Sequence, residues 1–500
     1  MGADVQGPPA DRTFSLGSED PEKHVYEHQS RTASSCDAPL EPVSERKIIR
    51  KIDFRVVPVL CVLYLLAFLD RVNIANAALF GLRTDLNLRG DQYNTALVIF
   101  FVPYILCEIP SNALMKRFKP HVWLSGCMFM FGLVTCVQGL TQNYGGILAT
   151  RFFLGVFESG MFPGCFYLLA MWYKRQEAQK RYSFFFSSTT LAGAFGGLLA
   201  SAIGKMDGMR GYRGWRWVFI LEGTLTCVIA IACFFIIPDF PEEVKWLSPS
   251  EKQFVKSRLY DDVGHSQSEQ TISVKSALKV LSDYKVIVGG FMYLGLIVPA
   301  YGYAYFAPSI IQQLGHGSIQ TQLLSVPPWA CAFVLAMTVA IISDHTRHRF
   351  IFTLIPIAIA LTGFIILLVV HNHQHLQYAA LFLAASGAYT AMPVIVCWFN
   401  TNLAGHTRRA VATGWQVGFG NIGGIIAAFS FLAKDAPKYI TGYSICIAFI
   451  CVSVLACCIY FMGLVWENRQ RDLGRVSGVE LPEVEKQKLG DLNPDYRYLL

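Results

Sequence analysis

Charged residues are scarce in this sequence. Only 15% of its 500 residues are Asp, Glu, Lys or Arg, and 53% are hydrophobic, whereas soluble domains contain about 25% charged residues. The hydrophobic residues gather in runs of about twenty, which is the length of helix that crosses about 30 Å of hydrocarbon. The shortage of charge therefore excludes a soluble protein and predicts an all-α membrane protein.

Several chemical signatures are also missing. The sequence has no Gly-Lys-Ser/Thr phosphate loop, so ATP bound to this chain is excluded as the energy source. No nucleophile elbow, zinc-binding helix or dinucleotide fingerprint stands in a usable context, which predicts that the protein is not an enzyme and carries no cofactor. His371, His373 and His375 alternate in a short loop without a neighbouring Cys or carboxylate, and this pattern favours solvated histidines over a metal site.

The N-terminus lacks the apolar core of a secretory signal. Residues 1–45 are polar, no hydrophobic run begins before Val56, and the segment is therefore predicted to be a disordered tail. Most of the 14 cysteines lie inside apolar runs, so we interpret them as small buried hydrophobic residues and not as a disulfide framework. The net charge of +7 is attributed to basic loops on one side of a membrane and not to nucleic-acid binding.

The apolar runs predict about twelve membrane-spanning helices. They lie near residues 56–76, 93–113, 122–141, 145–172, 183–204, 215–237, 286–307, 323–342, 351–370, 376–399, 410–432 and 441–463. A polar stretch from Pro238 to about Tyr284 divides them six and six. The predicted parts are a cytoplasmic tail (1–50), a six-helix half (51–237), a cytoplasmic central loop (238–284), a second six-helix half (285–464) and a cytoplasmic tail (465–500). Such a layout places a binding site between the halves, near the membrane midplane.

Basic residues cluster beside alternate spans. Groups of Lys and Arg precede the first predicted span and follow the second, fourth, eighth and tenth, although Lys205 and Arg210 on the other side weaken the asymmetry. Because basic loops stay in the cytoplasm, this pattern predicts a multi-pass protein with both termini cytoplasmic. The plasma membrane is the predicted location, and the vacuolar membrane is the alternative.

Two acid–arginine pairs stand inside apolar stretches. Arg151 and Glu158 lie seven residues apart, or about two helical turns, so both side chains point to the same side of one helix. Asp70 and Arg71 close the first apolar run. A charge in the bilayer core costs several kcal/mol, so such residues normally face the protein interior or a watery cavity. The alternatives are a structural ion pair in the first case and an interfacial pair at a helix end in the second. We interpret both pairs as parts of a transport site for a small charged molecule.

Two further acids lie in predicted spans. Glu108 is near the inner end of the second span, and we interpret it as a structural partner of the basic loop that contains Lys116 and Arg117. Glu222 is deeper in the sixth span but follows a pair of interfacial tryptophans, so an interfacial and a functional role stay equally open.

Seven segments of the sequence form a recognisable set. They are residues 68–75 (FLDRVNIA), 104–112 (YILCEIPSN), 151–164 (from the arginine through the glutamate to Pro-Gly), 214–223 (GWRWVFILEG), 398–402 (WFNTN), 405–410 (GHTRRA) and 420–425 (GNIGGI). Together they resemble the anion:cation symporter branch of the major facilitator superfamily, and most of all its fungal allantoate, nicotinate and pantothenate permease group. The resemblance covers about residues 51–468 and implies the major facilitator fold, with about twelve transmembrane helices in two six-helix halves.

The resemblance implies roles for the four buried charges. In characterised members of that branch, the acid after helix one and the acid in helix four take part in proton coupling, which corresponds to Asp70 and Glu158 here. The arginines at matching positions contact the carboxylate of the substrate, which corresponds to Arg71 and Arg151.

Other residues are expected to line the binding site. The resemblance implies this role for Asn421 and Trp398. The tyrosines of the seventh span are spaced so that at most one or two of them face a cavity and stack on a ring substrate, and we assign this role to Tyr301 and Tyr305.

Two short basic loops occupy the same position in each half, between its second and third helix. They are residues 111–120 (SNALMKRFKP) and 343–349 (SDHTRHR). Major facilitators carry a Gly-x-x-x-Asp-Arg/Lys-x-Gly-Arg/Lys-Arg/Lys loop there; the first copy here is degenerate, and the second keeps an acid. We predict gating roles for Lys116, Arg117, Asp344 and Arg347.

These observations predict a proton-coupled symporter of a small organic anion, a carboxylate such as a vitamin or a nitrogen-source acid, that works by alternating access. Its partners are the anion, the proton and the lipid bilayer, without nucleic acid, and it is predicted to be a monomer. The first alternative is an efflux transporter of a fungal secondary metabolite. The second is a nutrient sensor that binds the anion without transport, against which the short tails argue because they leave no room for a large signalling domain.

Overall fold

The computed structural model describes residues 44–115, 118–263, 274–346, 348–404, 406–475, 491 and 493–500. The chain divides into two units, Met1–Ile48 and Ile49–Leu500, and the arrangement described below is that of the second unit. The predicted N-terminal tail lies almost entirely outside the described residues. The predicted gating residues Lys116, Arg117 and Arg347 also lie outside them, and the side chain of Asp344 is not described.

Apolar runs form the long helices of this protein, and the described residues contain no strand. The helices are α2 (Glu45–Leu79), α3 (Leu82–Asp85), α4 (Gln92–Met115), α5 (Pro120–Gln138), α6 (Tyr144–Glu158), α7 (Met161–Trp172), α8 (Arg175–Ile203), α9 (Gly214–Ile236), α10 (Pro249–Val263), α11 (Val274–Leu281), α12 (Tyr284–Gln313), α13 (Ser318–Thr346), α14 (Arg349–Val369), α15 (Gln374–Thr401), α16 (His406–Ser430) and α17 (Ile440–Asp472). The prediction of an all-α membrane protein is confirmed.

Ten helical stretches of the described residues are long and apolar enough to cross a membrane. The helices α4 and α16 lie at the places of the second and eleventh predicted spans and are also more than twenty residues long. The count of twelve spans stays a prediction.

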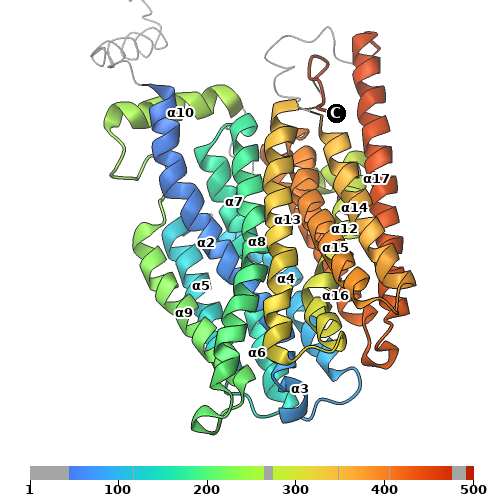
Figure 1. Cartoon of the computed structure of the whole chain (residues 1–500). Helices are drawn as coiled ribbons and strands as arrows, with labels where there is room; N and C mark the ends of the chain where they lie inside the picture. Colours follow the sequence, from blue (N-terminus) through green and yellow to red (C-terminus); the bar gives the residue numbers. More distant parts are fainter. Residues whose placement is uncertain are drawn as a thin grey trace, which may run out of the picture. The chain divides into compact units, whose positions relative to one another are not determined.

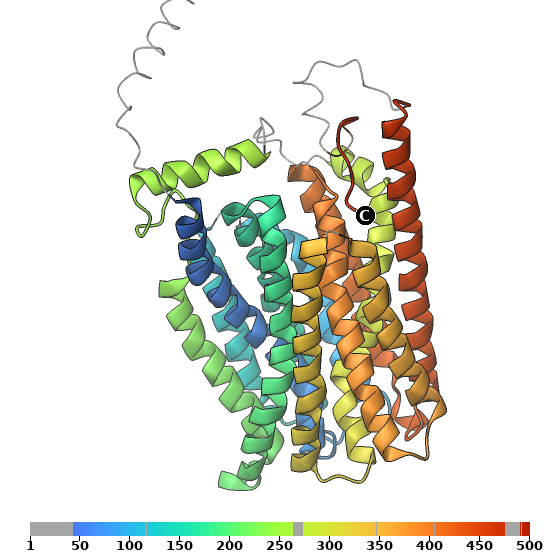
Figure 2. The same ribbon diagram turned by 45° about the horizontal axis from the view of Figure 1, so that its top comes forward.

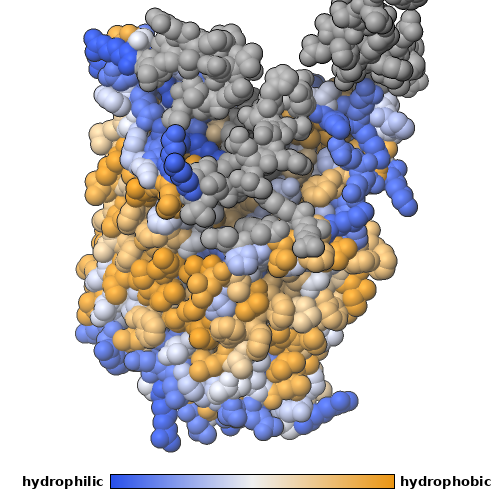
Figure 3. Space-filling view, turned by 180° about the vertical axis from the view of Figure 1, so that it is seen from behind, coloured by the Kyte–Doolittle hydropathy of each residue, from blue (hydrophilic) through white to orange (hydrophobic). Residues whose placement is uncertain are grey.

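The surface of the bundle matches a bilayer. A hydrophobic band crosses the middle of the molecule in Figure 3, and hydrophilic residues gather above and below it. Large apolar side chains point outward from the helices, among them Val228 and Ile231 on α9 and Val334 and Ile341 on α13, each more than half exposed. Exposed apolar surface on this scale is unfavourable in water and favourable against lipid.

The helices pack in two groups. Most helices that precede α10 contact mainly one another, as do most of those that follow α11, and the two groups lie side by side (Figure 1; Figure 2). Helix α8 is the exception, because it contacts mainly the other group. Between the groups, α8 packs on α13 and α15, and α4 packs on α16. Any site between the groups is therefore built from residues that are far apart in the sequence.

Glycines allow the close approach of α8 to α13. A Cβ atom at Gly193 would lie 2.3 Å from the ring of Trp329, and one at Gly197 would lie 2.7 Å from Oγ of Ser325. In α16, a Cβ atom at Gly424 would lie 2.2 Å from the ring of Phe101 on α4. These contacts explain the glycines of the fifth and eleventh predicted spans by helix packing.

We expect Gly193→Leu to destabilise the protein, because the new side chain overlaps the ring of Trp329. Overpacking of this kind costs about 1–3 kcal/mol, which thermal unfolding of the purified protein in detergent will show as a lower Tm. Gly126→Leu is the matched control, because a Cβ atom at Gly126 on α5 has no neighbour within 4 Å. Equal Tm values for the two variants would contradict the packing role of Gly193.

Hydrogen bonds join the two groups of helices at one end of the bundle. The hydroxyl of Ser318 donates a hydrogen bond to the carbonyl oxygen of Leu79 at 3.0 Å. The amide of Asn94 donates to the carbonyl oxygens of Ala428 at 2.5 Å and Phe431 at 3.3 Å. Under the predicted orientation this is the extracellular end.

Two helices differ from their predicted course. The first span does not end at Asp70 and Arg71, because α2 continues to Leu79 and buries both side chains; an interfacial pair at a helix end is therefore wrong. The fourth span is interrupted after Glu158, where α6 ends and α7 begins three residues later. Pro163 explains the interruption, since it has no N–H to donate to the carbonyl oxygen four residues earlier.

The last residues of the chain pack against helix ends. The N–H of Arg349 on α14 donates to the carbonyl oxygen of Leu500 at 2.7 Å, and the indole N–H of Trp398 on α15 donates to that of Leu499 at 2.9 Å. The hydroxyl of Tyr498 accepts hydrogen bonds from Lys285 on α12 at 2.9 Å and from α17. Residues 493–500 thus connect four helices of the second group.

We expect deletion of residues 493–500 to lower the Tm of the protein clearly. The deletion leaves the buried indole N–H of Trp398 without its carbonyl partner, and each buried polar group without a partner costs about 1–3 kcal/mol. Arg497→Ala is the control, because the side chain of Arg497 is at the surface and its ion pair with Asp472 is exposed; such ion pairs contribute about 0–1 kcal/mol. A deletion that leaves the Tm unchanged would show that the segment is not structural.

Candidate functional site

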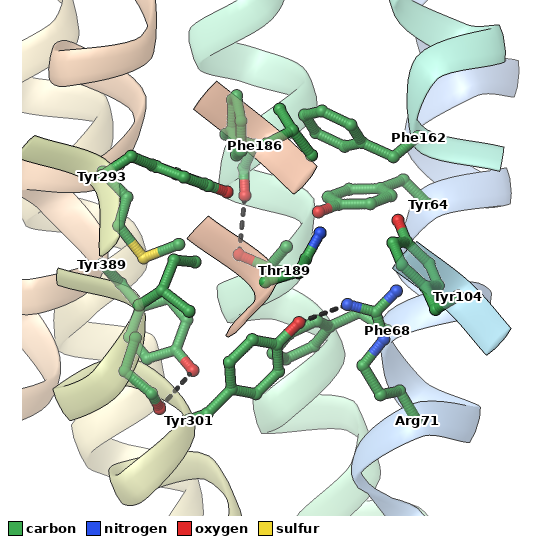
Figure 4. Close-up of a pocket in the computed structure, with 15 residues that line it drawn as sticks. Tyr64, Phe68, Arg71, Tyr104, Phe162, Phe186, Thr189, Tyr293, Tyr301 and Tyr389 are labelled. Carbon is green, nitrogen blue, oxygen red and sulfur yellow. Dashed lines mark hydrogen bonds between the residues drawn. The ribbon is translucent and has the colours of Figure 1, made fainter. Parts of the chain in front are cut away.

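A cavity lies between the two groups of helices and is lined mainly by aromatic side chains (Figure 4). The aromatic lining residues are Tyr64, Phe68, Tyr104, Phe162, Phe186, Tyr293, Tyr301 and Tyr389. Among the described residues that line the cavity, only Arg71 is charged. The free volume of the cavity is about 20 Å³, room for about one or two water molecules, so the side chains close around the site in this state.

Arg71 on α2 holds the centre of the site. Its Nε donates a hydrogen bond to Oε1 of Glu158 on α6 at 2.9 Å, and its NH2 group forms a second hydrogen bond to the same oxygen. Its NH1 group donates to the hydroxyl of Tyr301 on α12. The guanidinium also lies 4.9 Å from the ring centroids of Phe100 and Tyr104, at cation–π distance.

This arrangement follows from the cost of burying charge. The side chains of Arg71 and Glu158 are 5% and 1% exposed, and a buried guanidinium requires an anion while a buried carboxylate requires a cation. The aromatic rings remove water from the pair and thereby strengthen its electrostatic attraction. The pair joins two helices of the first group, and the bond to Tyr301 extends it to the second group.

Arg151 has a different partner from the one that the sequence suggests. Its NH1 group donates to the backbone carbonyl oxygen of Arg71 at 3.2 Å, and Glu158, its partner in the alternative structural interpretation, binds Arg71 instead. Within the described part of the chain, Nε and NH2 of Arg151 have no hydrogen-bond partner although the residue is 1% exposed. A structural ion pair between Arg151 and Glu158 is therefore wrong, and Arg151 keeps two buried donors for another anion.

Asp70 lies beside these two arginines. Its Oδ2 accepts a hydrogen bond from the hydroxyl of Thr226 on α9 at 3.2 Å, and its Oδ1 has no partner among the described residues. The fold thus gathers all four charged residues that the sequence singles out, Asp70 and Arg71 from α2 and Arg151 and Glu158 from α6.

The other predicted site residues divide into two sets. Tyr301 and Asn421 line the cavity, and Tyr305 lies behind Tyr301 with the ring centroids 5.5 Å apart in a stacked arrangement. Trp398 does not line the cavity, because it is fully buried where α15 meets residues 493–500, and it donates its indole N–H to Leu499 there. Its assignment to the substrate site is not supported by this position.

The two remaining acids are also buried. Glu108 is 3% exposed, and its Oε2 has no hydrogen-bond partner among the described residues. Lys116 and Arg117, the basic residues of the loop with which it was expected to pair, lie outside the described residues. Glu222 is 1% exposed and lies next to α2, so an interfacial position for it is wrong.

Sequence reasoning missed most of the aromatic lining. The signal was present on α2, where Tyr64, Phe68 and Arg71 follow one another at spacings of four and three residues and so share one helical face. Tyr293 and Tyr301 on α12 are two helical turns apart in the same way. What the spacing did not show is that these two faces meet across one cavity.

Comparison with known proteins identifies the family. The family model described as Major Facilitator Superfamily matches residues 60–428. The chain belongs to the Major Facilitator Superfamily. The expectation from the sequence is confirmed at this level, and with it the expectation of a membrane transporter that is not an enzyme.

Similar proteins with names of their own are also transporters of the Major Facilitator Superfamily type. The chain is 32% identical to the MFS-type transporter cnsO of Penicillium expansum over 91% of each chain. It is 33% identical to the major facilitator-type transporter hxnP of Emericella nidulans over 94% of this chain and 96% of the relative. A solved structure, a bacterial homologue of the human lysosomal transporter Spinster in an inward-facing and occupied conformation, aligns with a TM-score of 0.60 at 14% identity and covers 81% of this chain and 96% of that chain. This last likeness shows the fold.

Proposed function

We propose that this major facilitator is a proton-coupled symporter of a small organic anion, as in the anion:cation symporter branch, and that the anion is a carboxylate. The observation that carries the proposal is the buried bond of Arg71 to Glu158 and Tyr301 inside an aromatic cavity. An arginine in such a place needs an anion, and in this state the protein's own carboxylate takes that position.

A substrate carboxylate competes for the same arginine. It forms two parallel hydrogen bonds with a guanidinium, which is the strongest way to bind this group. When the substrate takes Arg71, Glu158 loses its cation in a buried place, where an unpaired carboxylate is costly, and it binds a proton. This exchange of partners thus takes up one proton at Glu158 with each anion.

Arg151 provides a second contact for the anion. Its Nε and NH2 have no hydrogen-bond partner in the described part of the chain, and leaving such donors unpaired costs about 1–3 kcal/mol, more for charged groups. Binding of an anion removes this cost. The two arginines then bind the same carboxylate, and each of them donates hydrogen bonds to one of its oxygens.

The same bonds connect binding to alternating access. Arg71 belongs to the first group of helices and Tyr301 to the second, so their hydrogen bond helps to hold the groups together in this state. A substrate that replaces Tyr301 on Arg71 weakens that connection. We propose that this exchange lets the two groups move relative to each other around the bound anion.

Uptake by proteoliposomes tests the proposal. The purified protein is reconstituted and offered radiolabelled nicotinate, pantothenate, allantoate and aromatic acids, with and without an inward proton gradient. We expect accumulation of at least one acid only with the gradient. Equal accumulation with and without the proton gradient would contradict proton coupling. If a correctly folded protein accumulates none of the acids, efflux of a larger metabolite becomes the better explanation. Uptake of such a metabolite into inside-out vesicles tests it directly.

A further inference from the structure

A second buried polar cluster lies on α2, where this helix packs against α9. The hydroxyl of Thr226 donates to Oδ2 of Asp70 at 3.2 Å, and the amide of Asn73 donates to Oε2 of Glu222. Asp70 and Asn73 are one helical turn apart on α2, and Glu222 and Thr226 are one turn apart on α9. The two acids are thus connected reciprocally between antiparallel helices, and about one helical turn separates them.

Among the described residues, neither carboxyl group of this pair has a cation as a direct partner. Asp70 and Glu222 are each 1% exposed, and each keeps one oxygen, Oδ1 and Oε1, without a hydrogen-bond partner in the described residues. Arg151 lies beside Asp70, because its NH1 group donates to the backbone carbonyl oxygen of Arg71. In the described part of the chain, Glu222 is hydrogen-bonded to the neutral Asn73 and not to a cation.

Other titratable groups around the pair do not change this balance. Those that interact with Asp70 from neighbouring positions are Arg151, Glu158, Glu222 and Cys227, and the one that interacts with Glu222 is Asp70. Glu158 is itself paired with Arg71. Two ionised carboxylates at this separation repel each other, and an isolated buried carboxylate is costly, so one of the two acids holds a proton.

We infer that Asp70 and Glu222 form a two-carboxyl proton site, with Glu222 as an additional proton-binding residue of the transport cycle. In the state seen here the site holds one proton on Glu222, and the Asp70 carboxylate balances Arg151. When Arg151 turns to a bound anion, Asp70 loses its cation and takes a proton from water, so that an O–H bond forms on its carboxylate. This inference extends the proposed symport and depends on it for its role in transport.

The charge balance gives the inference a measurable consequence. With a monovalent anion bound, one proton on Glu158 leaves the site neutral if Asp70 stays ionised. A further proton on Asp70 makes the loaded site carry one positive charge. An inside-negative membrane potential then drives uptake in addition to the proton gradient.

Infrared spectroscopy tests the proton site without any substrate. The full-length protein in lipid vesicles is titrated with pH, and the carbonyl stretch of protonated carboxyl groups is followed. We expect a band that persists well above the usual titration range of carboxylic acids, is lost in Glu222→Gln and is retained in Asp70→Asn. Glu222→Asp is expected to keep a shifted band, and it serves in place of the Gln variant if that variant fails to fold. A band that is unchanged in Glu222→Gln would overturn the inference.

Uptake under a membrane potential tests the role of the site in transport. For whichever acid the reconstituted protein accumulates, a potassium diffusion potential with the inside negative is expected to increase accumulation by the wild type. In Asp70→Asn this increase is expected to disappear, because asparagine cannot take the further proton, while the part of the gradient-driven uptake that needs only Glu158 is kept. A merely structural role would lower both responses together and would overturn the transport role. If no acid is accumulated, the proposed function fails while the infrared result still decides whether Glu222 holds a proton.

Discussion

Glu158→Gln is expected to abolish proton-driven accumulation of the substrate while the protein still exchanges substrate across the membrane. Glutamine has nearly the same size and can still accept the hydrogen bonds of Arg71, but it cannot bind and release a proton. Because the proposed coupling step is the exchange of partners on Arg71, losing the proton-binding group is expected to remove the coupling and not the binding site. The loss of accumulation is expected to be about tenfold or more, equivalent to about 1.4 kcal/mol of driving force.

Two assays on the same proteoliposomes separate coupling from binding. Net uptake driven by an inward proton gradient is expected to fall to background, whereas counterflow between substrate on both sides is expected to continue. Glu243→Gln is the matched control, because Glu243 pairs with Lys119 at the surface with both side chains largely exposed. If Glu158→Gln still concentrates substrate with the proton gradient, Glu158 is not the coupling acid.

Arg71→Lys is expected to raise the KM for the anion by about 10- to 150-fold, because charge-assisted hydrogen bonds worth about 1.5–3 kcal/mol are lost. Lysine keeps the positive charge that Glu158 requires, so the protein is expected to fold. It cannot form the two parallel bonds to a carboxylate that a guanidinium forms, and its single ammonium group cannot bind Glu158 and Tyr301 with the same geometry.

Initial rates of uptake over a range of substrate concentrations measure this effect. The change is expected mainly in KM, since the proton-carrying acid is untouched. Arg213→Lys is the matched control, because Arg213 is more than half exposed and pairs with Asp85 at 3.5 Å. An unchanged KM in Arg71→Lys would place the anion on Arg151 alone.

The positions of the buried charges could be predicted from the sequence, and so could the helices that carry them. A run of apolar residues long enough to span a bilayer forms a helix almost without regard to context, because its backbone must satisfy its own hydrogen bonds in lipid. A charged residue inside such a run must face the protein interior. Asp70, Arg71, Arg151 and Glu158 therefore stand out from composition and helical spacing alone, and their burial agrees with the expectation.

The partners of those charges could not be predicted. The spacing of Arg151 and Glu158 correctly places both on one side of a helix, yet Glu158 pairs with Arg71, 87 residues away in the sequence. Trp398 belongs to one of the segments on which the family resemblance rests, but it lies at a helix end, where it contacts residues 493–500. Helical periodicity predicts which residues share a face of a helix, but it does not predict which other helix packs against that face.

Length, hydropathy and helical period are local properties of the chain, so the amino-acid sequence is enough to predict an all-α membrane protein with charges inside its helices. Tertiary packing is needed to show that Arg71 connects Glu158 to Tyr301 across the two groups of helices, and that Asp70 and Glu222 lie in one cluster between α2 and α9. Both arrangements depend on how helices distant in sequence pack against one another, and that packing is set by side-chain shape along whole helices and not by any single motif.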